Sequence, residues 1–101
     1  MTIAQQQAHI IKIAKPILRK SGVKKAALFG SAARGEMHKK SDIDFLVKMA
    51  KDKSLLDIVG LKLDLEGALK KKVDVVTYDS VHPLLKNAIL REQKLIYEEK
   101  S

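Results

Sequence analysis

The chain has 101 residues, of which 46% are hydrophobic and only 4% aromatic, and its formal net charge is +8. This length favours a single domain, residues 1–101, with a core built from aliphatic side chains. Few aromatic rings are present to stack on bases, so nucleic acid is disfavoured as a partner. The positive charge favours either polyanionic partners such as nucleotide phosphates or a lysine-coated surface without a specific partner.

The sequence contains no cysteine, which excludes disulfide bonds and thiolate metal sites. None of its apolar runs approaches the roughly 20 residues that cross a bilayer. Its first residues lack the basic and apolar segments of a signal peptide. We therefore expect a cytoplasmic protein without membrane association.

The first half of the chain predicts a helix and two strands. Apolar residues recur at helical spacing over residues 2–20, where Pro16 should kink or split the helix. Residues 24–29 form a short apolar run that is typical of a buried strand. Residues 31–41 are small, polar and interrupted by glycine, which predicts a loop with one helical turn after Ser31. Residues 42–48 are expected to form the second strand.

The second half predicts a helix, a strand, a helix and a closing strand. Ser54 and Asp57 have the spacing of a capping box and open a helix over residues 54–70. That helix is apolar around much of its circumference, so its excess apolar surface belongs either to the core of a small fold or to an interface with another chain. A strand follows at 73–77, then a helix capped by Ser80 with Pro83 in its first turn, and a strand at 94–97. The buried stripe of this last helix should consist of Leu84, Leu85, Ala88 and Ile89.

The resulting order, α-β-β-α-β-α-β, predicts a single domain of the α/β (α+β) class. The three histidines are too dispersed to form a metal site and are interpreted as surface or capping residues: His9, His38 and His82. Tyr78 and Tyr97 are interpreted as packing residues.

The most informative segment joins a turn at Gly30 and Ser31 to two aspartates downstream. Side chains alternate faces along a strand, so Asp42 and Asp44 project together while Ile43 packs on the other side. Two carboxylates in this arrangement can bind a pair of hard cations about 3.5–4 Å apart, the geometry used for in-line displacement at phosphorus.

A third acid, Asp74, lies in another strand-like run. If this strand neighbours that of Asp44, Asp74 becomes a third metal ligand and can accept the proton of the attacking group. A single aspartate at a strand edge is commonly only solvated. Three carboxylates at close range, however, repel one another unless cations are bound, so a purely structural role is costly.

Gly30 permits a positive φ or a close backbone approach, and Ser31 offers a hydroxyl and an amide, both of which suit phosphate oxygens. Alone, a Gly-Ser turn indicates only a turn. Arg34 either binds phosphate or forms an ion pair with Glu36.

Residues 28–36 (LFGSAARGE) and 41–47 (SDIDFLV) together resemble the signature of the DNA polymerase beta-type nucleotidyltransferase superfamily. With its short length and the VDVV run at 73–76, the chain resembles in particular the minimal nucleotidyltransferases (MNT, MntA-like antitoxins) of prokaryotes. The resemblance covers residues 22–97.

This resemblance implies a small mixed β-sheet flanked by helices. It also implies ATP as substrate and two Mg²⁺ ions held by Asp42, Asp44 and Asp74, with Gly30 and Ser31 holding the triphosphate. Similar proteins are encoded beside a small all-helical HEPN ribonuclease toxin and act as its antitoxin by transferring AMP to a tyrosine. Larger relatives carry an additional acceptor-binding domain. We therefore expect the acceptor here to arrive on another polypeptide, in a hetero-oligomer.

The sequence thus predicts a Mg-dependent nucleotidyltransferase that adenylylates a HEPN toxin. Two alternatives stay open. One is a non-catalytic antitoxin that acts by binding, and the other is a nucleotidyltransferase for a small-molecule or RNA acceptor presented by a separate subunit. Nothing in the sequence reads a Watson–Crick edge, so the nucleotide base is not specified.

Overall fold

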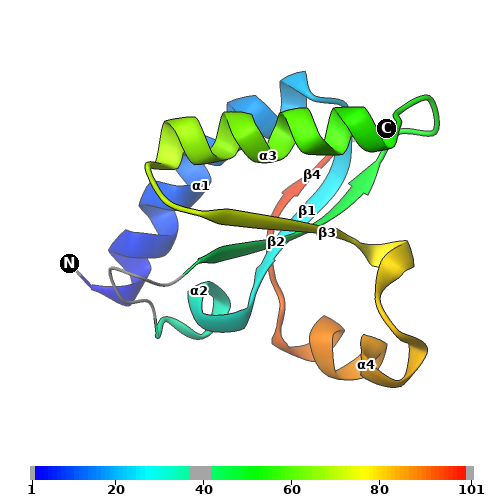
Figure 1. Cartoon of the computed structure of the whole chain (residues 1–101). Helices are drawn as coiled ribbons and strands as arrows, with labels where there is room; N and C mark the ends of the chain where they lie inside the picture. The colour runs from blue at the N-terminus through cyan, green and yellow to red at the C-terminus, as the bar shows by residue number, and fades with distance from the viewer. Residues whose placement is uncertain (1, 37–41, 100–101) are drawn as a thin grey trace.

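The computed structural model describes residues 2–36 and 42–99, which form a four-stranded sheet with the strand order β3-β2-β1-β4 (Figure 1). β2 and β3 are parallel, whereas β1 is antiparallel to both β2 and β4. The predicted mixed sheet is therefore confirmed. In chain order the elements are α1 (Ile3–Lys20), β1 (Val23–Phe29), α2 (Gly30–Arg34), β2 (Ile43–Met49), α3 (Leu55–Leu69), β3 (Val73–Thr77), the 3₁₀ turn η1 (Tyr78–Ser80), α4 (Pro83–Glu92) and β4 (Lys94–Glu98).

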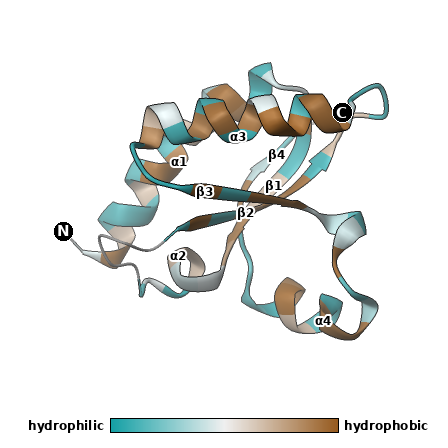
Figure 2. Cartoon of the chain, in the orientation of Figure 1, coloured by the Kyte–Doolittle hydropathy of each residue, from teal (hydrophilic) through white to brown (hydrophobic). Residues whose placement is uncertain are grey.

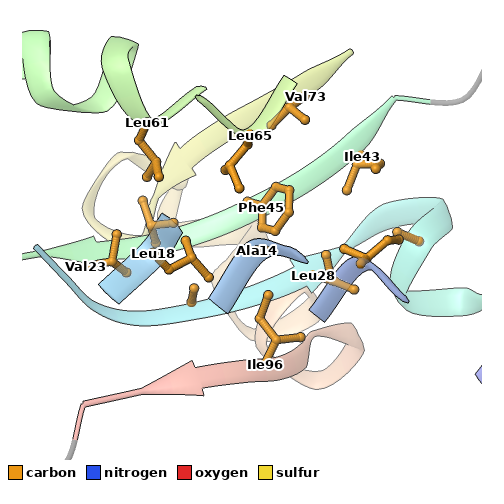
Figure 3. Close-up of a cluster of buried hydrophobic side chains, with 14 residues drawn as sticks. Ala14, Leu18, Val23, Leu28, Ile43, Phe45, Leu61, Leu65, Val73 and Ile96 are labelled. Carbon is orange, nitrogen blue, oxygen red and sulfur yellow. The ribbon is translucent and has the colours of Figure 1, made fainter. Parts of the chain in front are cut away.

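The core lies between the sheet and two helices. α1 and α3 contact each other on one side of the sheet, and α4 lies on the opposite side (Figure 1). Figure 3 shows Ala14 and Leu18 of α1 and Leu61 and Leu65 of α3 gathered around Phe45 of β2, and none of these side chains is more than 1% exposed. Burying large aliphatic and aromatic side chains in this way contributes about 1.5–3 kcal/mol each.

The other face of the sheet is also partly covered. Ala27 and Leu46 are register partners, and both are fully buried outside the α1/α3 core cluster. Because side chains alternate along a strand, Asp44 shares this second face with Leu46, while Phe45 points into the core. The acidic residues therefore face away from α1 and α3.

Side chains cap the two long helices, and the cap of α3 is the one that the sequence predicts. The Thr2 hydroxyl accepts from the Gln5 amide at 3.1 Å, and the Gln5 side chain accepts from the Thr2 amide at 2.9 Å. At α3, the Asp57 carboxylate accepts from the Ser54 amide at 2.8 Å. α1 is not split at Pro16, because this residue lies on the exposed side, where solvent can bond the carbonyl that the missing N–H leaves unpaired.

The prediction for α4 is wrong in two respects. Its N-cap is His82, whose Nδ1 accepts from the Leu84 amide at 3.1 Å, whereas the Ser80 hydroxyl donates to the Thr77 carbonyl inside η1. Leu84 and Leu85 are 86% and 57% exposed rather than buried, and only Ala88 and Ile89 are partly buried. The physical reason is placement: α4 contacts α2 rather than lying flat on the sheet.

Tyr78 joins the end of β3 to the end of α4. Its hydroxyl donates a hydrogen bond to Oε1 of Gln93 at 2.5 Å, and Nζ of Lys25 lies 5.4 Å from the centroid of its ring. Burial, with a smaller contribution from Glu98, raises the pKa of the Tyr78 phenol. Both tyrosines are half-buried, and Tyr97 packs against the core, in line with the interpretation of these residues as packing residues.

The outer side of α3 carries apolar residues that no described segment of the chain covers. Leu55, Leu56, Val59 and Leu63 are all exposed, so the excess apolar surface of this helix does not belong to the core. Figure 2 colours most of α3 as hydrophobic along its length. Across the ranges 2–36 and 42–99, no helix is both long enough and apolar enough to cross a membrane.

Candidate active site

Gly30 stands at the junction of β1 and α2, where its backbone has a φ of 67°. A Cβ at this position would lie 2.6 Å from Oδ2 of Asp44. Real side-chain carbons do not approach an oxygen so closely. Both expectations for Gly30, a left-handed φ and a close approach, are therefore met, and the group that approaches is a carboxylate.

The pairing of β2 with β3 brings two acidic residues side by side. Asp44 and Asp74 are register partners in this parallel pair, and Asp44 is also the register partner of Phe29, the residue before Gly30. Register partners project from the same face of a sheet. Asp42 precedes β2 by one residue and is exposed. Asp44 thus lies between the Gly30 turn on one side and Asp74 on the other.

The electrostatics of Asp44 reflect this crowding. Partial burial raises the pKa of its carboxyl most, the negative charges of Asp74 and Asp42 raise it further, and the positive charge of Arg34 lowers it. The charged form of Asp44 is therefore disfavoured in the absence of a cation. A partly buried carboxyl with a raised pKa in a cluster of acids is typical of a functional site.

Gln7 fixes the position of α2, and the sequence analysis did not identify it. Its Nε2 donates to the carbonyl oxygens of Ala32 and Ala33, at 3.0 and 3.2 Å. These carbonyls end a helix of five residues that has few internal hydrogen bonds. Gly35, with a φ of 71°, then closes α2 in the left-handed conformation. No local pattern around Gln7 signals this role, because its acceptors lie 25 and 26 residues away.

Ser31 and Arg34 lie on α2 itself. Ser31 is half-buried, and its carbonyl accepts from the Glu36 amide at 2.8 Å. Arg34 pairs through Nε with Glu36 at 3.1 Å and through Nη1 with Glu92 of α4 at 3.7 Å. Of the two alternatives for Arg34, the ion pair with Glu36 is therefore the one that the structure contains. These pairs are exposed, and exposed ion pairs contribute about 0–1 kcal/mol, so a phosphate can displace them at little cost.

The donor set fits a hard divalent cation. Asp42, Asp44 and Asp74 offer only carboxylate oxygens, the ligands that Mg²⁺ prefers, and the repulsion that raises the pKa of Asp44 is relieved when a cation binds. Within the described part of the chain, no three acidic or histidine side chains are already drawn together tightly enough to hold a metal ion. His9 is exposed, His82 is a helix cap, and His38 lies outside the described residues.

Comparisons with known proteins point to one kind of chemistry. The family model described as "Polymerase beta, Nucleotidyltransferase" matches residues 11–101, which include Gly30, Asp44 and Asp74. A Methanocaldococcus jannaschii protein named "Putative protein adenylyltransferase MJ0435" is 60% identical over 77 residues, or 76% of this chain and 83% of that protein.

Two further similarities are to a second adenylyltransferase and to a chain in a toxin–antitoxin structure. The protein adenylyltransferase MntA of Thermococcus cleftensis is 32% identical over 92 residues, which cover 91% of this chain and 93% of that protein. A chain in the crystal structure of a toxin–antitoxin with AMP-PNP aligns with a TM-score of 0.76 and 26% identity, over 89% of this chain and 74% of that one.

Proposed function

Because this chain belongs to the polymerase beta nucleotidyltransferase family, whose model matches residues 11–101, we propose that it transfers AMP from ATP to a protein partner. We further propose that this partner is a HEPN toxin and that the transfer inactivates it. The observation that carries the proposal is the position of Asp44 in the sheet: the β2–β3 register sets it beside Asp74, and the β1–β2 register sets it against Gly30.

Gly30 and Ser31 bind the triphosphate in this proposal. The absence of a Cβ at Gly30 leaves the Asp44 carboxylate close to the backbone, so phosphate oxygens and carboxylate oxygens can share the same cation. The Ser31 hydroxyl and amide add hydrogen bonds to the phosphates. Arg34 exchanges its exposed ion pairs for a phosphate contact.

Asp42, Asp44 and Asp74 would hold two Mg²⁺ ions, which supply charge neutralisation of the triphosphate and acidify the acceptor hydroxyl. Asp44 is the best-fixed member of this set, because it is half-buried between Gly30 and β3. Asp74 is exposed on the edge strand β3, so an incoming hydroxyl can reach it and transfer its proton to the carboxylate.

A protein acceptor fits the surroundings of the site. α4 contacts α2, and two of its leucines, Leu84 and Leu85, are largely exposed. Apolar side chains clustered at a rim beside a catalytic site are a common feature of protein-binding surfaces. The acceptor is then a separate chain that docks beside the triphosphate, which supports a hetero-oligomer.

The test is transfer of label from [α-³²P]ATP to a candidate HEPN toxin, with the two proteins purified together. We expect Mg-dependent labelling of the toxin, lost in Asp44→Asn and in Asp74→Asn. The matched control is Asp64→Asn, which removes an exposed aspartate on α3 away from the site and should label the toxin like wild type.

Each alternative gives a different result in the same assay. Neutralisation of the toxin that persists in Asp44→Asn and without ATP would mean that the chain acts only by binding. Labelling of RNA ends or of a small molecule, with the toxin unlabelled, would assign a different acceptor. Equal labelling by wild type and Asp44→Asn would refute the assigned chemistry.

A further inference from the structure

The outer surface of α3 has an alternating pattern of leucine and glycine. Leu56, Gly60, Leu63 and Gly67 follow one another at spacings of four, three and four residues, which places them within about 60° of arc on a helix with 3.6 residues per turn. They lie opposite the buried side of α3, where Leu61 and Leu65 enter the core. Leu56 and Leu63 are 81% and 61% exposed. We call these four residues the α3 stripe.

No contact among residues 2–36 and 42–99 explains the two glycines. A Cβ added at Gly60 or at Gly67 would meet no atom within 4 Å, and the glycines with a positive φ lie elsewhere in the chain. Glycine in a helix interior lowers helix stability relative to alanine. Each glycine therefore destabilises α3 while leaving an open gap between exposed leucines, as expected where another helix approaches closely.

We propose that the α3 stripe is a homodimer interface, in which α3 of a second copy packs antiparallel to α3 of the first. A two-fold axis that passes between the two helices, level with the midpoint between residues 61 and 62, places Leu56 opposite Gly67 of the second copy and Leu63 opposite Gly60 of the second copy. Both leucines of the α3 stripe then enter a gap left by a glycine of the second copy. Such self-complementarity is what a two-fold interface requires.

Charge and area set the strength of this dimer. The stripe carries no charge in a chain whose formal net charge is +8, so two copies that repel elsewhere can meet there. The same axis places the acidic flank of α3, with Asp57 and Asp64, beside the same flank of the second copy, so these carboxylates repel one another. α3 has 15 residues, so a strip about 22 Å long and 10–12 Å wide buries on the order of 300 Å² per copy, below the roughly 800 Å² of a standard interface. The dimer is therefore weak, and salt strengthens it.

This arrangement leaves the candidate active site open. Phe45 points into the core beneath α3, and Asp44 projects from the opposite face of the sheet. The two sites of a dimer consequently face away from the interface, and two acceptors can bind at once. The inference goes beyond nucleotidyl transfer and does not depend on it.

Sedimentation equilibrium of the full chain at about 1 µM to 1 mM tests the proposal, because interfaces of this size associate in that range. We expect the mass to rise from 11.3 kDa toward twice that value, at lower concentrations when salt is added. Gly60→Ala and Gly67→Ala should weaken the dimer at least tenfold while raising the thermal midpoint of the dilute chain. The control Lys62→Ala, an exposed residue of α3 outside the stripe, should dimerise like wild type.

Cross-linking tests the orientation, since the chain has no cysteine of its own. Leu56→Cys mixed with Gly67→Cys should give a disulfide-linked heterodimer under mild oxidation, in preference to either homodimer. A monomer at every concentration would overturn the proposal, as would glycine variants that dimerise like wild type. Preferential linkage of Leu56→Cys to itself would overturn the antiparallel register.

Discussion

Gly30→Ala is expected to damage both stability and activity. The new methyl group must adopt a φ of 67°, which costs an L-residue about 1–2 kcal/mol. Its Cβ also starts 2.6 Å from Asp44 Oδ2, so the carboxylate has to rotate away, at about 0.5–1.5 kcal/mol for an off-rotamer side chain. The free energy of unfolding should therefore fall by about 1.5–3.5 kcal/mol, which corresponds to about 6–28 °C in a domain of this size.

The displacement of Asp44 should reduce activity more than the stability loss explains. A shift of about 1 Å in a catalytic group can cost on the order of 100-fold in rate. Gly35→Ala is the matched control, because its φ of 71° imposes nearly the same backbone cost. The three atoms nearest to its Cβ belong to the side chain of Ile3, a residue that is 55% exposed and able to move into solvent.

The two variants are compared by urea unfolding and by the initial rate of AMP transfer, at a temperature where both are folded. We expect both to lose stability, but only Gly30→Ala to lose on the order of 100-fold in rate. Equal rates in Gly30→Ala and Gly35→Ala would refute the reasoning, because Asp44 would then tolerate displacement from the position it has beside Gly30.

Three further predictions follow from single side chains. Asp44→Asn should abolish activity yet raise the thermal midpoint at neutral pH. The pKa of Asp44 is raised in the folded chain, so its negative charge destabilises the fold above that pKa. The difference in midpoint between variant and wild type should therefore shrink as the pH falls toward 3.8. Mg-ATP should raise the midpoint of wild type but not of this variant. Gln7→Ala should lose about 1 kcal/mol of stability and raise the KM for ATP, because α2 loses its two hydrogen bonds from α1; the neighbouring Gln6→Ala should do neither. Asp57→Asn should lower the thermal midpoint at neutral pH, since the hydrogen bond from the Ser54 amide lowers the pKa of Asp57 and the charged carboxylate stabilises the fold. This stabilisation is present above 3.8 and is lost as the pH falls through the folded pKa. The melting curves of variant and wild type should therefore converge in acid.

The sequence predicted most elements because their local signals are strong. β3 occupies residues 73–77 as expected, and β1 and β2 begin within one residue of their predicted starts. The capping box at α3 was also visible, because Ser54 and Asp57 are close in sequence. Each of these features depends on alternation or spacing within a few residues, and a linear pattern contains that information.

Features that depend on how many layers the fold has could not be predicted in this way. The helical spacing of Leu84 and Leu85 is the same whether the sheet covers them or not, and a chain of this length covers one face of its sheet more fully than the other. For the same reason, the excess apolar surface of α3 could not be assigned to core or interface. The anchoring of α2 by Gln7 is a contact between distant segments and has no local signature.

The parallel pairing of β2 with β3 ties the site to the order in which the polypeptide is synthesised. Gly30 and Asp44 leave the ribosome before α3, and Asp74 follows thirty positions after Asp44. A nascent chain that stops short of β3 has the turn and the first carboxylates but lacks their neighbour. In the proposed mechanism, translation must therefore pass β3 and the crossover must fold back before all three carboxylates are together, so a product truncated before β3 is expected to lack transfer activity.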